Sequence, residues 1–129
     1  MEHGLVKGLV KHLGIHFAEA TPERVVAELE IREEVATLGG AIHGGTLMAL
    51  ADTAGAVGTL CHLKANPEAG KATATMESKT NFFSAASAGK VRAESTPLHK
   101  GRRTQVWQTR VTDEKGKLLS LTIQTQMIL

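Results

Sequence analysis

A long uncharged stretch in the middle of the chain limits its fold more than any other feature of the sequence. Asp52 is the only Asp, Glu, Lys or Arg between Glu34 and Lys64. Apolar residues recur within this stretch at the i, i+3 and i+7 spacings of a helix: Leu47, Leu50, Ala54, Val57 and Cys61. Most other positions are Ala, Gly or Thr, and a helix that is apolar nearly all round is normally buried. We therefore predict one long central helix from Gly44 to about His62, around which the rest of the chain folds.

The segments on both sides of this helix change to a two-residue period, which is typical of strands. Strands are expected over Val25–Ile31, Ala74–Phe82, Lys90–Glu94, Gln105–Val111 and Leu119–Leu129. Lys115-Gly116 is typical of a hairpin turn, and the short connections favour antiparallel pairing. Together with a short amphipathic helix over Leu5–Leu13, the pattern predicts an α+β fold, in which a curved antiparallel sheet of five strands wraps around the central helix.

Length and composition indicate one globular domain, residues 1–129. The 42% hydrophobic and 22% charged residues are ordinary for such a domain, and no repeat or linker divides the chain. A net charge of only +2 and four aromatic residues (three Phe and one Trp) give little support to nucleic-acid binding. Two Gly-Gly pairs and a carboxylate make a membrane span a poor interpretation of the uncharged stretch.

Cysteine and histidine usage bears on the compartment and on cofactors. Cys61 is the only cysteine, so an internal disulfide is excluded and the expected location is the cytoplasm. Its place on the apolar stripe of the central helix favours packing over a role as nucleophile. The histidines do not have the spacing of a metal site, so we expect neither a metal nor a cofactor.

Asp52 is the first candidate for chemistry. A lone carboxylate within a buried helix is costly unless it is paired or used. Isolated carboxylates of this kind concentrate at functional sites, which favours a role for Asp52 as a nucleophile or a general base. The structural alternative is a carboxylate bonded to a nearby hydroxyl, such as that of Thr53, or one that simply points into a cleft.

His43-Gly44-Gly45 stands where the central helix is expected to begin. Free N–H groups at a helix N-terminus stabilise a developing oxyanion, and glycine lets a carbonyl approach them; the alternative is a plain Gly-rich turn. Gly44 and Asp52 lie about 12 Å apart along one helix, too far to act on the same carbonyl carbon. Either they share no site, or a two-fold axis brings Gly44 of one subunit near Asp52 of another.

These residues resemble a known family. His-Gly-Gly followed by Leu-Ala-Asp, with the Asp nine residues after the His, is similar to the hotdog-fold acyl-CoA thioesterases of the phenylacetate-pathway (PaaI-like) group, over most of the chain. The resemblance implies hydrolysis of an acyl-CoA, with Asp52 as nucleophile or general base and the Gly44 N–H polarising the thioester carbonyl. It also implies that His43 shapes the site, that Ser84 positions water or the carboxylate, and that a homodimer, assembled into a homotetramer, supplies these groups from opposite subunits.

Two features bear on the substrate and on an alternative function. Many members of this family have Asn six residues before the His, where this chain has Thr37, a hydroxyl with fewer donors. A basic turn at His99–Arg103 offers Lys100, Arg102 and Arg103 to the phosphates of CoA, with Gly45 as a further substrate contact, although basic turns are often only solvated loops. Thr37 favours the alternative of a non-catalytic acyl-CoA-binding sensor, and a hotdog dehydratase is a third interpretation.

Overall fold

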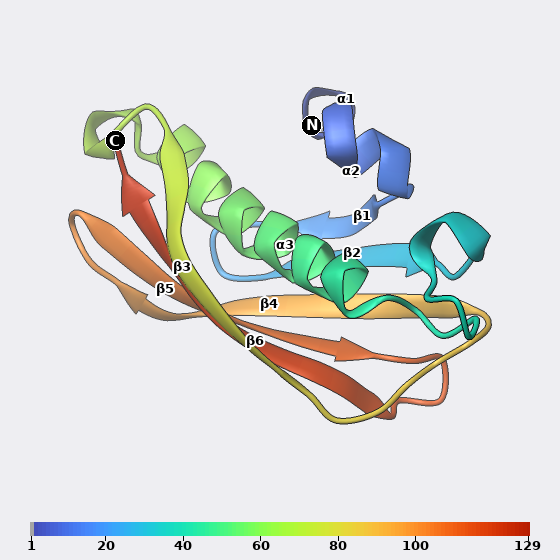
Figure 1. The fold of residues 1–129 in the computed structure, drawn as a ribbon. Coiled ribbons are helices and arrows are strands. Elements are labelled where there is room, and N and C mark those ends of the chain that lie inside the picture. The colour runs from blue at the N-terminus through green and yellow to red at the C-terminus, as the bar shows by residue number, and fades with distance from the viewer. Residues whose placement is uncertain (1) are drawn as a thin grey trace.

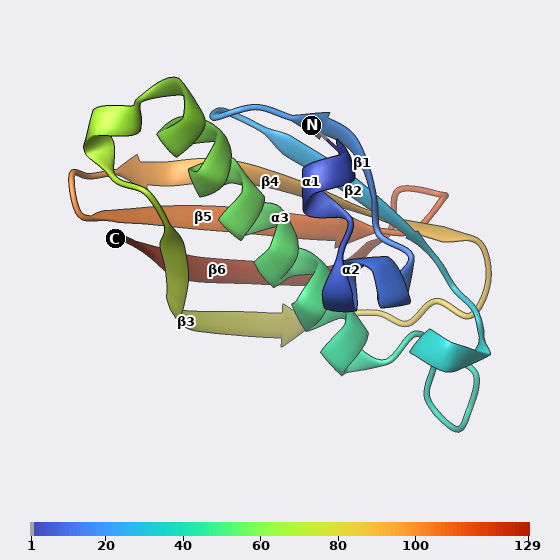
Figure 2. The ribbon, with the colours of Figure 1, turned by 90° about the horizontal axis from the view of Figure 1, so that it is seen from above.

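The computed structural model describes residues 2–129 as one antiparallel sheet with a long helix across one face (Figure 1). The strands are β1 (His16–Ala20), β2 (Val25–Glu30), β3 (Thr73–Phe82), β4 (Lys90–Lys100), β5 (Thr104–Thr112) and β6 (Leu118–Ile128). Their order across the sheet is β1-β2-β4-β5-β6-β3, and every neighbouring pair is antiparallel. The predicted curved sheet wrapped around one central helix is confirmed (Figure 2).

The central helix α3 spans Gly44–Ala65, slightly longer than predicted. Its start is fixed by His43, which has extended backbone angles and accepts the N–H of Gly45 on its side chain. At its end the Asn66 side chain donates to the carbonyl of His62, and Pro67 opens a short 3₁₀ turn. Leu47, Leu50, Ala54, Val57 and Cys61 all lie in the core, as their spacing predicts.

The N-terminal region differs from the prediction. The single helix expected over Leu5–Leu13 is divided into α1 (Glu2–Leu5) and α2 (Gly8–Leu13), because Lys7 between them has extended backbone angles and Gly8, the first residue of α2, has a positive φ of 56°. The strand β1 was not predicted at all. It has five residues, of which only Phe17 is buried, so a two-residue pattern has almost no length over which to show.

The strand β4 was also predicted too short. The prediction over Lys90–Glu94 stops six residues before β4 ends. Beyond Ser95 the strand is irregular, because Pro97 lies within it and the register shifts between Pro97 and His99. Proline lacks the N–H that a ladder needs, and this hides the continuation of β4 from a sequence pattern. The predicted hairpin turn at Lys115-Gly116 is confirmed between β5 and β6, where Gly116 has a φ of 82°.

The face of β6 that packs against α3 is the polar one. Its buried side chains in that row are Ser120, Thr122, Gln124 and Gln126. On the other face Ile123 remains 40% exposed. The sheet approaches α3 closely because the helix carries glycine at the contact: a Cβ on Gly55 would lie 2.6 Å from the amide of Gln124. The helix–sheet interface therefore contains a polar layer between apolar regions.

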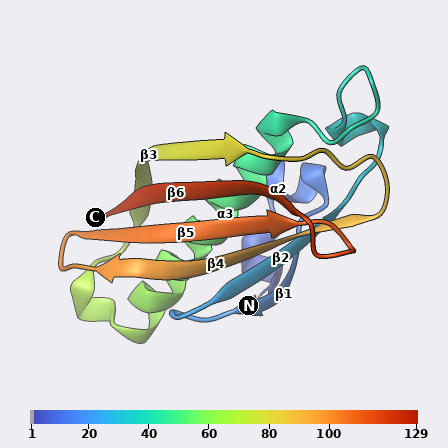
Figure 3. The ribbon, with the colours of Figure 1, turned by 90° about the horizontal axis from the view of Figure 1, so that it is seen from below.

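The two edges of the sheet are β1 and β3 (Figure 3). β3 is ten residues long, pairs only with β6, and has exposed side chains at eight of its ten positions. Met76 and Phe82 on this strand are 55% and 51% exposed. A long, exposed edge with apolar side chains is an available surface for strand addition. Among the residues that the structure describes, no helix combines the length and the apolar character needed to cross a bilayer.

Candidate functional site

Asp52 lies on the side of α3 that faces β3 and β6, and it is partly buried. Its Oδ1 atom accepts a hydrogen bond of 2.5 Å from the hydroxyl of Thr75 on β3 and one of 3.2 Å from Nε2 of Gln124 on β6. The hydroxyl beside Asp52 is thus that of Thr75, and not that of Thr53, which the structural alternative named. A carboxylate that accepts two hydrogen bonds on one oxygen can keep the other for a substrate or water.

The contacts of Asp52 could not be found from the sequence. Thr75 and Gln124 are 23 and 72 residues away from it in the chain. The only available signal was the row of polar residues that alternates with apolar ones along β6, and such a row is typical of a solvent-facing side. Because the row faces α3 instead, Gln124 becomes a partner of Asp52.

The start of α3 presents one uncommitted backbone donor. Nδ1 of His43 accepts the N–H of Gly45 at 2.7 Å, so that amide is occupied. The next two amides of the helix both donate to the His43 carbonyl. Within residues 2–129 the N–H of Gly44 has no hydrogen-bond partner. Of the two predicted glycines, Gly44 therefore offers a donor at the positive end of the helix dipole, and Gly45 does not.

The remaining predicted catalytic residues lie around this helix start. The ring of Phe82 lies 3.3 Å from the point that a Cβ on Gly44 would take, which brings the end of β3 beside it. Ser84 follows two residues later, half-buried, with its N–H directed at the carbonyl of Leu119. Thr37 is exposed in the loop that precedes α3, where its backbone pairs with Ala41 and Gly40.

One chain does not bring Asp52 and Gly44 together. Both lie on the uninterrupted helix α3, so eight residues separate them by about 12 Å along the axis. Asp52 contacts the start of β3 through Thr75, whereas Gly44 contacts its end through Phe82. The two groups thus stand at opposite ends of the same edge strand.

The basic turn lies at the Asp52 end of the sheet. It joins β4 to β5. Gln105 lies two residues after Arg103 and pairs with Gln126 of β6, and Gln126 pairs with Thr75 of β3. Arg102 and Arg103 are exposed. Lys100 forms an ion pair of 3.6 Å with Glu23, which leaves the two arginines as the freer cations of the turn.

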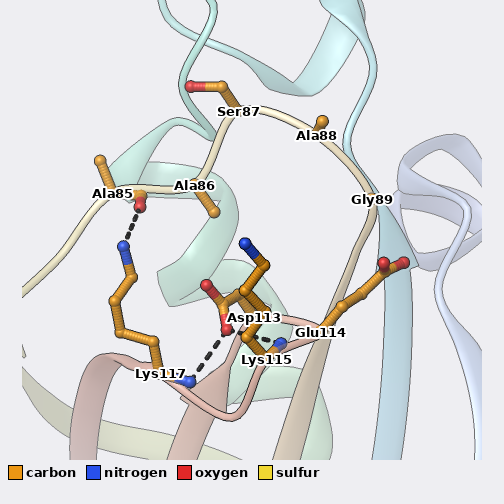
Figure 4. A pocket seen from close by; sticks show the side chains of 9 residues that line it. All are labelled: Ala85, Ala86, Ser87, Ala88, Gly89, Asp113, Glu114, Lys115 and Lys117. Atoms are coloured by element: carbon orange, nitrogen blue, oxygen red, sulfur yellow. Dashed lines mark hydrogen bonds between the residues drawn. The ribbon is translucent and has the colours of Figure 1, made fainter.

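A hollow on the surface lies elsewhere, between the segment Ala85–Gly89 and the β5–β6 hairpin (Figure 4). It has a volume of about 510 Å³. Two of its polar side chains already have partners: Lys117 Nζ donates to the Ala85 carbonyl, and Asp113 accepts two backbone N–H groups at 2.9 Å. The two backbone hydrogen bonds, chiefly the one from the backbone N–H of Lys117, lower the pKa of Asp113. The hairpin carboxylate is therefore a turn-stabilising group.

Two further observations concern nucleophiles and metals. Cys61 is buried on α3, and burial raises the pKa of its thiol, which disfavours the reactive thiolate. In the part of the chain that the structure describes, no three His, Cys, Asp or Glu side chains are grouped as a metal site would require.

Comparison with known proteins identifies the family. A family model described as Thioesterase superfamily matches residues 39–120. A 1,4-dihydroxy-2-naphthoyl-CoA hydrolase of Listeria monocytogenes is 32% identical over 114 residues, which cover 88% of this chain and 89% of that protein. The structure of a thioesterase of Haemophilus influenzae matches with a TM-score of 0.90 and 28% identity, covering 98% of this chain and 86% of that one.

The fold is shared more widely. The PaaI protein of Escherichia coli, from the phenylacetic acid degradation operon, matches with a TM-score of 0.86 over 99% of this chain and 90% of that one, at 21% identity. The structural likeness and the family match, which covers the helix with His43, Gly44 and Asp52, agree with each other. This chain is therefore a hotdog-fold member of the thioesterase superfamily.

Proposed function

We propose that this protein hydrolyses acyl-CoA thioesters to a free carboxylic acid and CoA. The observation that carries the proposal is the pair of uncommitted groups on α3: the free N–H of Gly44 and the carboxylate of Asp52, of which one oxygen is held and the other is open. The CoA ester as substrate is supported by the relative from Listeria monocytogenes, which is named as a 1,4-dihydroxy-2-naphthoyl-CoA hydrolase.

The chemistry has two forms that use the same residues. As a general base, Asp52 takes a proton from water while the water oxygen attacks the thioester carbon. As a nucleophile, its carboxylate attacks directly, forms a mixed anhydride and expels the CoA thiolate, and water then cleaves the anhydride. In both forms the thioester oxygen gains negative charge, and the N–H of Gly44 at the helix start donates to it. The thiolate takes a proton as CoA leaves.

A dimer through β3 would complete the site. In an antiparallel pair of β3 strands, opposite residues must lie on the same face of the sheet, and a two-fold axis at Ser78 satisfies this. It places Glu77 opposite the partner's Lys79, so that unlike charges meet twice. It also places Thr75 one residue from the partner's Phe82. Since Asp52 lies at Thr75 and Gly44 lies at Phe82, each site would combine Asp52 with the partner's Gly44.

The proposal also gives roles to the other residues that the sequence predicts at the site. His43 fixes the helix start by binding the N–H of Gly45, and Ser84 follows the Phe82 that borders Gly44. Arg102 and Arg103 would bind the phosphates of CoA. The homotetramer that the family resemblance implies would need a second contact, for which the outer face of the sheet offers the exposed side chains of Leu98 and Ile123.

Thiol release from a panel of aromatic, medium-chain and hydroxylated acyl-CoAs tests the reaction. We expect Asp52→Asn to lower kcat by about 10² to 10⁴, the usual contribution of a general base. Undiminished turnover by this variant would refute the role of Asp52. Tight binding of CoA esters by the wild type without turnover would instead select the non-catalytic sensor, the alternative that Thr37 in place of the family Asn favours.

The oxyanion donor has a matched pair of variants. Gly44→Pro removes the N–H at the first helical position, where proline is tolerated, whereas Gly44→Ala adds a Cβ and keeps the N–H. We expect the proline variant alone to lose most of its kcat. Equal mixtures of Gly44→Pro and Asp52→Asn subunits should recover about a quarter of wild-type activity, because half of the dimers are mixed and each has one intact site. A mixture as inactive as its parents would contradict the shared site.

A further inference from the structure

The hydrogen bonds to the side-chain carboxylate of Asp52 both end on one of its two oxygens. Thr75 and Gln124 both donate to Oδ1, from two different strands. The hydroxyl of Thr75 has a single proton, and its contact with the carboxylate is shorter than its 2.8 Å contact with Gln126. Within residues 2–129, no group donates to Oδ2. The carboxylate is therefore held in one orientation with a defined free oxygen.

Gln124 is itself firmly fixed. It is fully buried, and its Nε2 also donates to Oε1 of Gln126 at 2.7 Å and to the backbone carbonyl of Asp52 at 3.3 Å. Gln126 is held in turn by the hydroxyl of Thr73 at 3.0 Å. The amide of Gln124 lies where a Cβ of Gly55 would be. It thus reaches Asp52 only because α3 has glycine at that position.

Burial of Gln124 has a cost that packing does not explain. Its Oε1 atom is buried without a hydrogen-bond partner among the described residues. An apolar side chain of similar size would fill the same space without leaving a polar atom unsatisfied. The gain that offsets this cost is the donation by Nε2 to Asp52 and Gln126.

We propose that Thr75 and Gln124 are positioning residues for the hydrolysis: they fix Oδ1 of Asp52 so that Oδ2 faces the attacking water or the thioester carbon. This inference rests on the proposed function of Asp52. This role needs no contact between either residue and the substrate. Their effect is on the orientation of the carboxylate, and a small misplacement of a catalytic group is enough to slow a reaction greatly.

Four variants of the full-length protein test this role by steady-state kinetics. Thr75→Val and Gln124→Met remove one donor each, and we expect kcat to fall about tenfold to a hundredfold with KM little changed. Thr75→Ser keeps the hydroxyl and should restore kcat to near the wild-type value. Gln105→Met is the matched control, because Gln105 is an equally buried glutamine on the same face of the sheet, bonded to Thr59 and Trp107 and not to Asp52.

Melting temperatures separate stability from positioning. Both glutamine variants lose buried hydrogen bonds and should melt at lower temperatures, but only Gln124→Met should lose kcat. If Gln124→Met fails to fold, the comparison of Thr75→Val with Thr75→Ser decides, since Thr75 is on the exposed edge strand. An unchanged kcat in Thr75→Val, or an equal loss in Gln105→Met, would overturn the positioning role.

The outcome for the proposed function is distinct. A wild type that hydrolyses no thioester, or an Asp52→Asn variant that is fully active, would overturn the catalytic role of Asp52 and the positioning role with it. Hydrolysis that is lost in Asp52→Asn but intact in Thr75→Val and Gln124→Met would overturn only the positioning role.

Discussion

The indole ring of Trp107 occupies the space that a side chain at Gly58 would need. A Cβ on this helical glycine would lie 2.5 Å from Cζ2 of the ring, and Trp107 is fully buried. Helix propensity alone favours alanine over glycine by about 1 kcal/mol. Here the close contact between α3 and β5 should reverse the sign.

We therefore expect Gly58→Ala to lower the free energy of unfolding by about 1 to 3 kcal/mol, the usual effect of overpacking a core. Chemical denaturation measures it. Gly4→Ala is the control, because Gly4 lies in a helix with no atom near its potential Cβ, and it should be neutral or stabilising. An equal gain in stability at both positions would show that the ring of Trp107 moves freely.

The proposed pairing of β3 with a second copy predicts a charge-reversal pattern. Glu77→Lys should weaken the dimer, because it sets like charges opposite each other at two places across the axis. The double variant Glu77→Lys with Lys79→Glu should restore it. Cross-strand pairs contribute about 0.2 to 1 kcal/mol each, so the single variant should shift Kd severalfold in sedimentation velocity at low salt. Equal Kd values for the single and double variants would place the axis elsewhere.

The basic turn predicts a selective effect on CoA esters. Arg102→Ala combined with Arg103→Ala should raise KM for an acyl-CoA about tenfold or more, since charge-assisted hydrogen bonds to phosphate are among the strong ones. KM for the same acyl group on N-acetylcysteamine, which has no nucleotide, should stay the same. Lys7→Ala with Lys11→Ala removes two exposed cations from the N-terminal region and serves as the control. A parallel rise in KM for both thioesters would argue that the turn supports the fold and not the nucleotide.

A pH-dependent contribution to stability is expected from Glu94. Arg24 joins three strands, because it binds Glu19 of β1 and Glu94 of β4 from the start of β2. The hydrogen bond with Arg24 lowers the pKa of Glu94. A carboxyl group whose pKa is lowered in the folded state stabilises that state above its unfolded pKa, and the contribution is lost as pH falls through the folded value.

Glu94→Gln should therefore cost stability at pH 7 and have almost no effect near pH 2. The ion pair is about one-third exposed, so the difference at pH 7 should be below about 1 kcal/mol. Urea denaturation at both pH values measures it. Glu68→Gln, at an exposed glutamate without an ion pair among the described residues, should show no such dependence. A constant difference at both pH values would assign the role of Glu94 to packing.

The sequence predicts the central helix and most strands because their patterns are local. The uncharged stretch around Asp52 and the alternation along β3 and β6 each extend over nine or more residues. The sequence pattern does not predict a strand correctly where tertiary contacts decide whether the strand forms or how far it extends. Phe17 is the only buried residue of β1, and Pro97 interrupts β4.

The candidate site divides in the same way. His43, Gly44 and Asp52 are close in the chain, so their spacing on one helix was readable, as was the distance between Gly44 and Asp52. Thr75 and Gln124 could not be predicted as partners of Asp52, because their contacts with it depend on which face of β6 turns toward α3. Gly55 of the helix leaves the space that the amide of Gln124 occupies on that face.

The open edge of β3 also bears on how this protein reaches its final form in a cell. A folded single chain leaves one side of the ten-residue strand β3 without a neighbouring strand, and another extended chain can pair with that side. The proposed pairing of β3 with a second copy then competes with misassembly, and both processes become faster as the concentration of newly made chains rises. Charged side chains on an edge strand discourage pairing with foreign strands, so Glu77 and Lys79, which would set the register of the proposed dimer, would also protect this edge against aggregation.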